Sequence, residues 1–217
     1  MISGLFKRDS AEAERQKSRI PRHSSGWKML QERLRTETSL RVMDIGPTSS
    51  QNINLLTGMG HSVYMADLLA DAFSPEFWKP ESPEAADGQT PAPVLDGESF
   101  FEQETAFRAR IFDCVLLWTT LDFLPEPLIE PLVERIYDAT EPGSQVFLFF
   151  HTRKGGSLNH YCRYHLTDKD AVEMQALDSH PIERIYTNRA IEKLFGKFSS
   201  YRFFLAKDDL YEALITR

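Results

Sequence analysis

Two carboxylates stand at the ends of two successive apolar segments, a spacing that is typical of a nucleotide-type site. The segment 41–46 reads Arg-Val-Met-Asp-Ile-Gly, so that Asp44 and Gly46 precede a polar turn. The segment 62–67 again ends on a carboxylate, Asp67. In a doubly wound α/β sheet, the carboxyl ends of the strands meet at one edge, where nucleotide ligands bind. The two acids therefore predict a site for an adenosine-like ligand at that edge.

Strands and helices alternate along the part of the chain that must position these acids. Trp27, Leu30 and Leu34 recur at helical spacing and predict a helix from residue 24 or 25. Thr48 opens a Thr-Ser-Ser-Gln capping box and is expected to begin the next helix. Apolar runs predict strands at 40–45, 62–67, 112–118 and 145–150. This alternation is typical of a doubly wound, mostly parallel sheet.

The end of the chain breaks that alternation. Strands are expected at 201–206 and 211–216, and the turn between them is too short for a right-handed crossover. These two strands must therefore be antiparallel. Further β-like pieces lie at 161–166 and 182–186.

The chain is expected to form one domain, because 217 residues bury enough surface for a single core. Residues 1–23 are polar and charged and are expected to be a basic, flexible leader to a domain over 24–217. Inserts are expected at about 71–99, which is rich in proline, and at 152–187.

These features together resemble the class I S-adenosylmethionine-dependent methyltransferases. Asp44-Ile-Gly46 resembles the start of that family's first motif, and Asp67 stands where the family holds the ribose hydroxyls. The strand 112–118 resembles the fourth-strand motif, and Glu141-Pro-Gly143 resembles the turn before the fifth strand.

The resemblance covers about residues 25–150 and 188–217. It implies a Rossmann-like methyltransferase fold with S-adenosylmethionine as cofactor. Thr48 and Ser50 stand where the family usually has its second and third glycines. Their β-carbons would crowd the ligand, whereas their hydroxyls and the helix N-terminus could bind its carboxylate. The loop is therefore expected to bind the cofactor weakly, in an altered pose, or not at all.

Each remaining candidate has a functional and a structural interpretation. Asp67 would accept ribose hydroxyls or cap a helix, and Asp44 would meet the cofactor's ammonium or cap its loop. Asp96 ends a short expected strand at 93–96 and would reach an adenine amino group or serve as a turn aspartate. Trp118 would flank a sulfonium or fill the core, and Asp122 would remove a proton or begin a helix.

Composition excludes several other classes of protein. Residues 36–217 carry a net charge of −12, which argues against a broad nucleic-acid surface. No apolar run approaches the roughly 20 residues of a membrane span, and a cytoplasmic protein is expected. The two cysteines lack partners at ligand spacing, so no metal site is predicted.

We therefore expect methyl transfer from S-adenosylmethionine to a small-molecule or protein acceptor. The alternative is a methyltransferase-like binding or scaffold domain that does not catalyse, which the substitutions at Thr48 and Ser50 favour. A dinucleotide oxidoreductase has less support, because no G-x-G-x-x-G follows the first strand.

Overall fold

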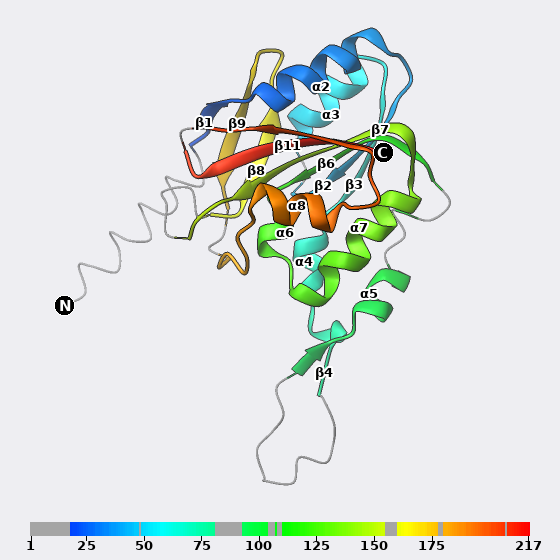
Figure 1. Cartoon of the computed structure of the whole chain (residues 1–217), viewed down its shortest axis with the longest axis vertical. Coiled ribbons are helices and arrows are strands. Elements are labelled where there is room, and N and C mark those ends of the chain that lie inside the picture. The colour runs from blue at the N-terminus through cyan, green and yellow to red at the C-terminus, as the bar shows by residue number, and fades with distance from the viewer. Residues whose placement is uncertain are drawn as a thin grey trace, which may run out of the picture.

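A computed structural model of the chain describes residues 18–47, 49–80, 93–103, 107, 110–154, 160–177, 180–206 and 208–217. Its centre is a six-stranded sheet in the order β10-β11-β7-β6-β2-β3 (Figure 1). The strands are β2 (Arg41–Ile45), β3 (Ser62–Ala66), β6 (Phe112–Trp118), β7 (Thr140–His151), β10 (Ser200–Phe204) and β11 (Leu210–Thr216). The neighbours among β3, β2, β6 and β7 are parallel, and β11 is antiparallel to both β7 and β10. This confirms the expected mostly parallel sheet with an antiparallel last strand.

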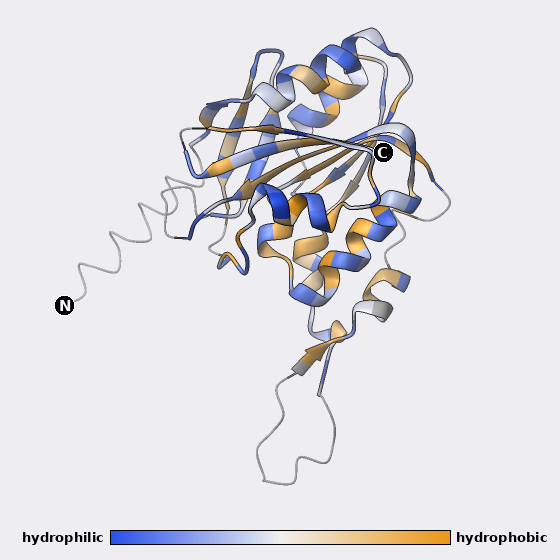
Figure 2. Ribbon diagram, viewed as in Figure 1, coloured by the Kyte–Doolittle hydropathy of each residue, from blue (hydrophilic) through white to orange (hydrophobic). Residues whose placement is uncertain are grey.

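Helices cover both faces of this sheet. One face carries α2 (Ser25–Thr36) and α3 (Ser50–Gly58). The other face carries α4 (Leu68–Ala72), α5 (Gly97–Gln103), α6 (Thr120–Phe123), α7 (Ile129–Asp138) and α8 (Asn188–Leu194), with short 3-10 helices at Pro75–Phe77 and Glu126–Leu128. Because both faces are buried, the central strands are mostly apolar (Figure 2).

Successive residues of β6 enter opposite cores, as the period of two in a strand requires. Val115 and Leu117 pack with the helices α4 to α8, whereas Leu116 and Trp118 pack with α2 and α3. The end of β6 therefore points the Trp118 ring to the face on which α3 begins.

A second sheet, of three antiparallel strands, lies on the same face as α2 and α3. Its order is β1 (Ile20–His23), β9 (Ala171–Ala176) and β8 (Cys162–Leu166). Tyr164, Val172 and Met174 join the apolar cluster of Trp27 and Trp118. The sheet is therefore a cover over one end of the fold.

This second sheet corrects two expectations. The folded part begins before residue 24, because Ile20–His23 pairs with β9. The strand β9 replaces the one expected at 182–186, whose amide groups bond elsewhere. The N–H groups of Glu183 and Arg184 donate to the Asp122 carbonyl, and that of Tyr186 donates to the His151 carbonyl.

A buried ion pair fastens the second sheet to the first. Arg22 of β1 is 7% exposed and pairs with Glu212 of β11, and it also bonds Asp208 at 3.0 Å. Glu212 accepts from the Gly26 amide at 2.7 Å, at the start of α2. A β-carbon on Gly26 would lie 2.5 Å from the Phe147 ring, so glycine is required where α2 approaches β7 and β11 this closely.

Two further expectations change. The strand at 93–96 is β5 (Pro93–Leu95), which pairs with β4 (Trp78–Pro80) in a separate ribbon rather than joining β3. The N-cap of α3 is Ser49, whose hydroxyl accepts from the Asn52 amide, and not Thr48, which lies outside the described residues. Among the described helices, none has both the length and the apolar composition needed to span a bilayer.

Candidate functional site

The carboxyl ends of β2, β3 and β6 lie side by side and bring the predicted residues of the first motif together (Figure 1). The Gly46 amide donates to the Ala66 carbonyl at 2.8 Å, so the loop after β2 is joined to the end of β3. Asp67 follows immediately. This is the edge at which the two acids were expected to meet.

Asp44 is buried, and each of its oxygens accepts a hydrogen bond. The Trp118 indole N–H donates to Oδ1 at 2.6 Å, and the Asn52 side-chain amide donates to Oδ2 at 3.0 Å. Burial raises the pKa of the Asp44 carboxyl to about 6, although both hydrogen bonds oppose the shift. Asp44 is therefore still ionised at neutral pH, with its charge held inside the protein.

The Trp118 ring lies over Gly46. A β-carbon added at Gly46 would lie 3.2 Å from Trp118 Cδ1, so the indole fills the space that this glycine leaves open. The ring stacks on Tyr164 with centroids 4.9 Å apart and an interplanar angle of 3°. Trp118 is only 3% exposed. One face of the Trp118 ring is therefore covered by Tyr164 and closed to a sulfonium in this arrangement.

Asp67 is held more loosely. Its Oδ1 accepts from the Ala70 amide at 3.5 Å, as the N-cap of α4, and from the Tyr161 hydroxyl at 3.5 Å. Both distances are at the outer limit of a hydrogen bond. The carboxylate is partly buried, and burial raises its pKa. It therefore retains acceptor capacity for a ligand.

Tyr161 and the strand β8 cover the sheet edge that carries Asp44 and Asp67. The Tyr161 hydroxyl would lie 3.9 Å from a β-carbon on Gly46, and its ring packs against Phe123 at 5.3 Å. Farther along β8, the His165 ring forms a hydrogen bond of 2.7 Å with the Ser49 hydroxyl. The segments that follow β2 and β6 thus lie under one cover.

Asp122 forms a buried pair with His151 at the ends of β6 and β7. Its Oδ2 lies 2.6 Å from His151 Nδ1 and accepts from the His151 amide at 2.8 Å. Its Oδ1 has no hydrogen-bond partner among the described residues, and the residue is 0% exposed. Burial raises the pKa of the Asp122 carboxyl to about 6. His151 is buried as well, so neither side chain of the pair is open to solvent in this structure.

Asp96 lies apart from these residues, on the β4–β5 ribbon. It pairs with Lys79, and its carboxylate accepts from the Ser99 amide at 3.0 Å at the start of α5. These contacts hold the pKa of Asp96 well below its usual range. The structure gives it a capping role and does not place it in the sheet beside Asp67.

Asn52 is the residue of this site that the sequence did not point to. Besides bonding Asp44, its amide donates to the Tyr164 carbonyl at 3.0 Å and its oxygen accepts from the Leu166 amide at 2.7 Å. Asn52 precedes the buried Leu56 by four residues. A polar side chain at that helical spacing is a signal that could have identified it.

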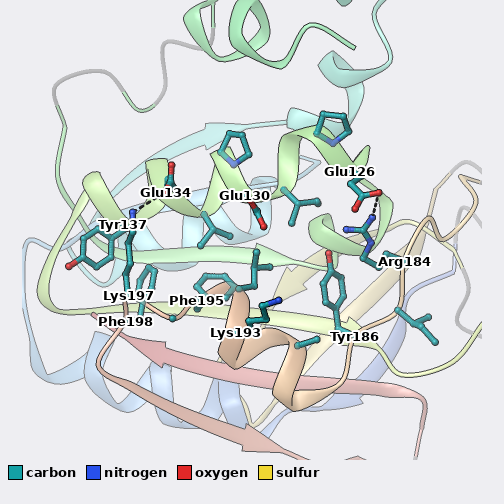
Figure 3. A pocket seen from close by; sticks show the side chains of 18 residues that line it. Glu126, Glu130, Glu134, Tyr137, Arg184, Tyr186, Lys193, Phe195, Lys197 and Phe198 are labelled. Atoms are coloured by element: carbon teal, nitrogen blue, oxygen red, sulfur yellow. Dashed lines mark hydrogen bonds and ion pairs between the residues drawn. The ribbon is translucent and has the colours of Figure 1, made fainter. Parts of the chain in front are cut away.

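A cavity of about 840 Å³ lies between α7 and α8 (Figure 3). Its ends are marked by the ion pairs Glu126–Arg184 and Glu134–Lys197. None of the described residues that line it is a predicted site residue. It is therefore distinct from the edge that carries Asp44 and Asp67.

Comparison with known proteins agrees with this architecture. A family model described as a methyltransferase domain matches residues 18–198. Among solved structures, the chain resembles an S-adenosylmethionine-dependent methyltransferase from Methanosarcina mazei with a TM-score of 0.51 at 12% identity, over 87% of this chain and 96% of that one.

A second solved structure is the 1,6-didemethyltoxoflavin-N1-methyltransferase of Burkholderia thailandensis, with a TM-score of 0.44 at 12% identity, over 89% of this chain and 77% of that one. No curated protein matches the chain. At 12% identity the likeness to the Methanosarcina mazei structure indicates the fold alone. The family model covers most of the chain, and the chain therefore belongs to the methyltransferase domain family.

Proposed function

We propose that the chain binds S-adenosylmethionine at the shared edge of β2, β3 and β6 and transfers its methyl group to a small molecule. Membership of the methyltransferase family supports the reaction class. Asp67 is the observation that carries the proposal, because a partly buried carboxylate with spare acceptor capacity follows the strand next to Asp44. Tyr161 and Tyr164 cover this edge and are buried in the described part of the chain, which favours a small acceptor over a protein.

The residues fit the two ends of the cofactor differently. Asp67 suits the ribose hydroxyls, since a carboxylate accepts two such hydrogen bonds strongly. Asp44 has the charge that an ammonium requires. Each of its oxygens already accepts one hydrogen bond, however, and the Trp118 ring stands over Gly46. The amino-acid end therefore fits only when Trp118 leaves this position.

Methyl transfer asks little acid–base chemistry of the protein. The bound cofactor would supply a methyl group on a sulfonium, which is already activated, so that alignment provides most of the acceleration. Asp67 and Asp44 would hold the two ends of the cofactor. Asp122 is our proposed catalytic acid–base residue, acting through the ring of His151 that it orients.

The second candidate is a domain that keeps the fold without the reaction. One specific contact favours it: Trp118 satisfies Asp44 and occupies the space above Gly46. A domain that never binds the cofactor could keep this arrangement permanently. Binding measurements separate the two candidates.

Titration calorimetry of the unmodified chain with S-adenosylhomocysteine should detect binding with a dissociation constant on the order of micromolar. Asp67→Asn should weaken it about tenfold, because the neutral amide still caps α4 but loses one charge-assisted hydrogen bond. Asp71→Asn, on the exposed side of the same helix, is the control and should bind as the unmodified chain does. Equal affinity in all three proteins would remove Asp67 from the site. No binding to the unmodified chain would favour the non-catalytic domain.

Stability should depend on pH through Asp44. Folding raises the pKa of the Asp44 carboxyl to about 6, so the folded state binds a proton on Asp44 more tightly than the unfolded state does. The contribution of Asp44 to the free energy of unfolding therefore falls as pH rises from about 4 to about 6. Asp44→Asn cannot titrate. The free energy of unfolding of the variant minus that of the unmodified chain should therefore rise by up to about 3 kcal/mol across this range, measured in urea. A difference that stays constant with pH would show that Asp44 is not a buried charge.

Asp122→Asn should slow methyl transfer from labelled cofactor to a small-molecule extract, while the affinity for S-adenosylhomocysteine stays unchanged. The amide keeps an oxygen for the His151 amide but cannot take up a proton. If rate and affinity fall together, Asp122 supports the fold of the site and is not the acid–base residue.

A further inference from the structure

Trp118 holds a backbone conformation that is unfavourable for its type. Its φ is 47°, in the left-handed region, where a β-carbon crowds the following carbonyl. The pairing of β6 with β7 also shifts register between Leu116 and Trp118. Strain of this kind persists only where surrounding contacts hold it, and it is concentrated at ligand sites and switch regions.

Four contacts hold the Trp118 ring in place. Its N–H donates to Asp44 at 2.6 Å, and one face stacks on Tyr164. Phe149 and Phe147 also pack against it, with centroids 6.0 Å and 6.1 Å away. The contact with Asp44 is the strongest in type, because a hydrogen bond to a buried carboxylate is charge-assisted. Without that acceptor, nothing in these contacts offsets the burial of the indole N–H.

The same carboxylate and the same space serve the amino-acid end of the cofactor in our proposed function. An ammonium group needs the charge of Asp44, and the atoms beside it need the room above Gly46. Trp118 offers Asp44 an N–H donor from a planar apolar ring and fills that room. Ring and ligand therefore exclude one another.

We propose that Trp118 is an internal competitor for the cofactor, and that binding exchanges the indole N–H on Asp44 for the ligand's ammonium. Displacing the ring lets the backbone of Trp118 leave the left-handed region, which offsets part of the lost stacking. Trp118 thereby sets the affinity for the amino-acid end and leaves the ribose end, at Asp67, unaffected. This inference rests on the proposed function.

The cover of the Trp118 ring is also linked to the start of α3. Tyr164 belongs to β8, whose neighbouring residues bond Asn52 and Ser49 of the α3 N-terminus. A movement of β8 would uncover Trp118 and the start of α3 together. The ring and its cover are thus one unit rather than independent parts.

The test compares two ligands on three proteins. S-adenosylhomocysteine has the amino-acid end, and adenosine lacks it. Trp118→Ala clears the space above Gly46, and Trp118→Phe keeps an aromatic ring without the N–H. In the unmodified chain, a ring that blocks the site in about nine molecules of ten lowers the apparent affinity about tenfold.

We expect Trp118→Ala to bind S-adenosylhomocysteine at least about tenfold more tightly than the unmodified chain, and Trp118→Phe to lie between the two. Adenosine should bind all three within about twofold. Trp78→Phe is the matched control, because the Trp78 indole bonds the Ala72 carbonyl and does not contact Asp44. Circular dichroism and thermal unfolding establish that each variant is folded. If Trp118→Ala does not fold, the binding of S-adenosylhomocysteine by Trp118→Phe alone tests the proposal.

Unchanged or weaker binding of S-adenosylhomocysteine by the folded Trp118 variants would overturn the proposal that Trp118 competes with the cofactor. The proposed function would remain intact in that case if the unmodified chain still binds S-adenosylhomocysteine. A gain that is equal for adenosine would also overturn the proposal of competition, since the ring would then obstruct the whole site. Absence of S-adenosylhomocysteine binding in every protein would overturn the proposed function and this inference with it.

Discussion

The hydrogen bond from Trp118 to Asp44 is the constraint on which the rest of this site depends. A carboxylate at the end of a buried strand must have donors, because an unpaired charge in that position would be very costly. Here the donors come from the protein itself, from Trp118 on the neighbouring strand and from Asn52 on α3. The hydrogen bonds of the acid that would bind a ligand are thereby formed without the ligand. A ligand that binds Asp44 must replace a partner that is already present.

The three-stranded sheet makes this arrangement stable. It places Tyr164 on the Trp118 ring, His165 on the α3 N-cap and Tyr161 between Gly46 and Asp67. Arg22 and Glu212 fasten the same sheet to β11 from the other side. Cover and core are consequently one packed body. The cost of opening the site is shared between aromatic stacking and the partners of Asn52, and relief of the backbone strain at Trp118 offsets part of it.

The sequence predicts the frame of this site better than its contents. Asp44, Gly46 and Asp67 meet at one edge because parallel strands bring their carboxyl ends together, a rule that needs no tertiary information. The bond between Trp118 and Asp44 joins residues 74 positions apart, and it depends on a left-handed backbone at a tryptophan, which no local propensity predicts. The pairing of β1 with β9 joins residues still farther apart in the chain, and β5 pairs with β4 outside the main sheet. The predictions from sequence therefore failed where the structure depends on contacts between residues far apart in the chain.

Whether the indole leaves Asp44 when ligand binds can be observed directly by NMR. The chain has three tryptophans, and the other two indoles donate to the Thr167 and Ala72 carbonyls, away from the ligand. Titration of the ¹⁵N-labelled chain with S-adenosylhomocysteine should shift the Trp118 indole N–H signal and speed its exchange with solvent, while the signals of Trp27 and Trp78 stay in place. A Trp118 signal that is unmoved and still protected at saturating ligand would contradict the account.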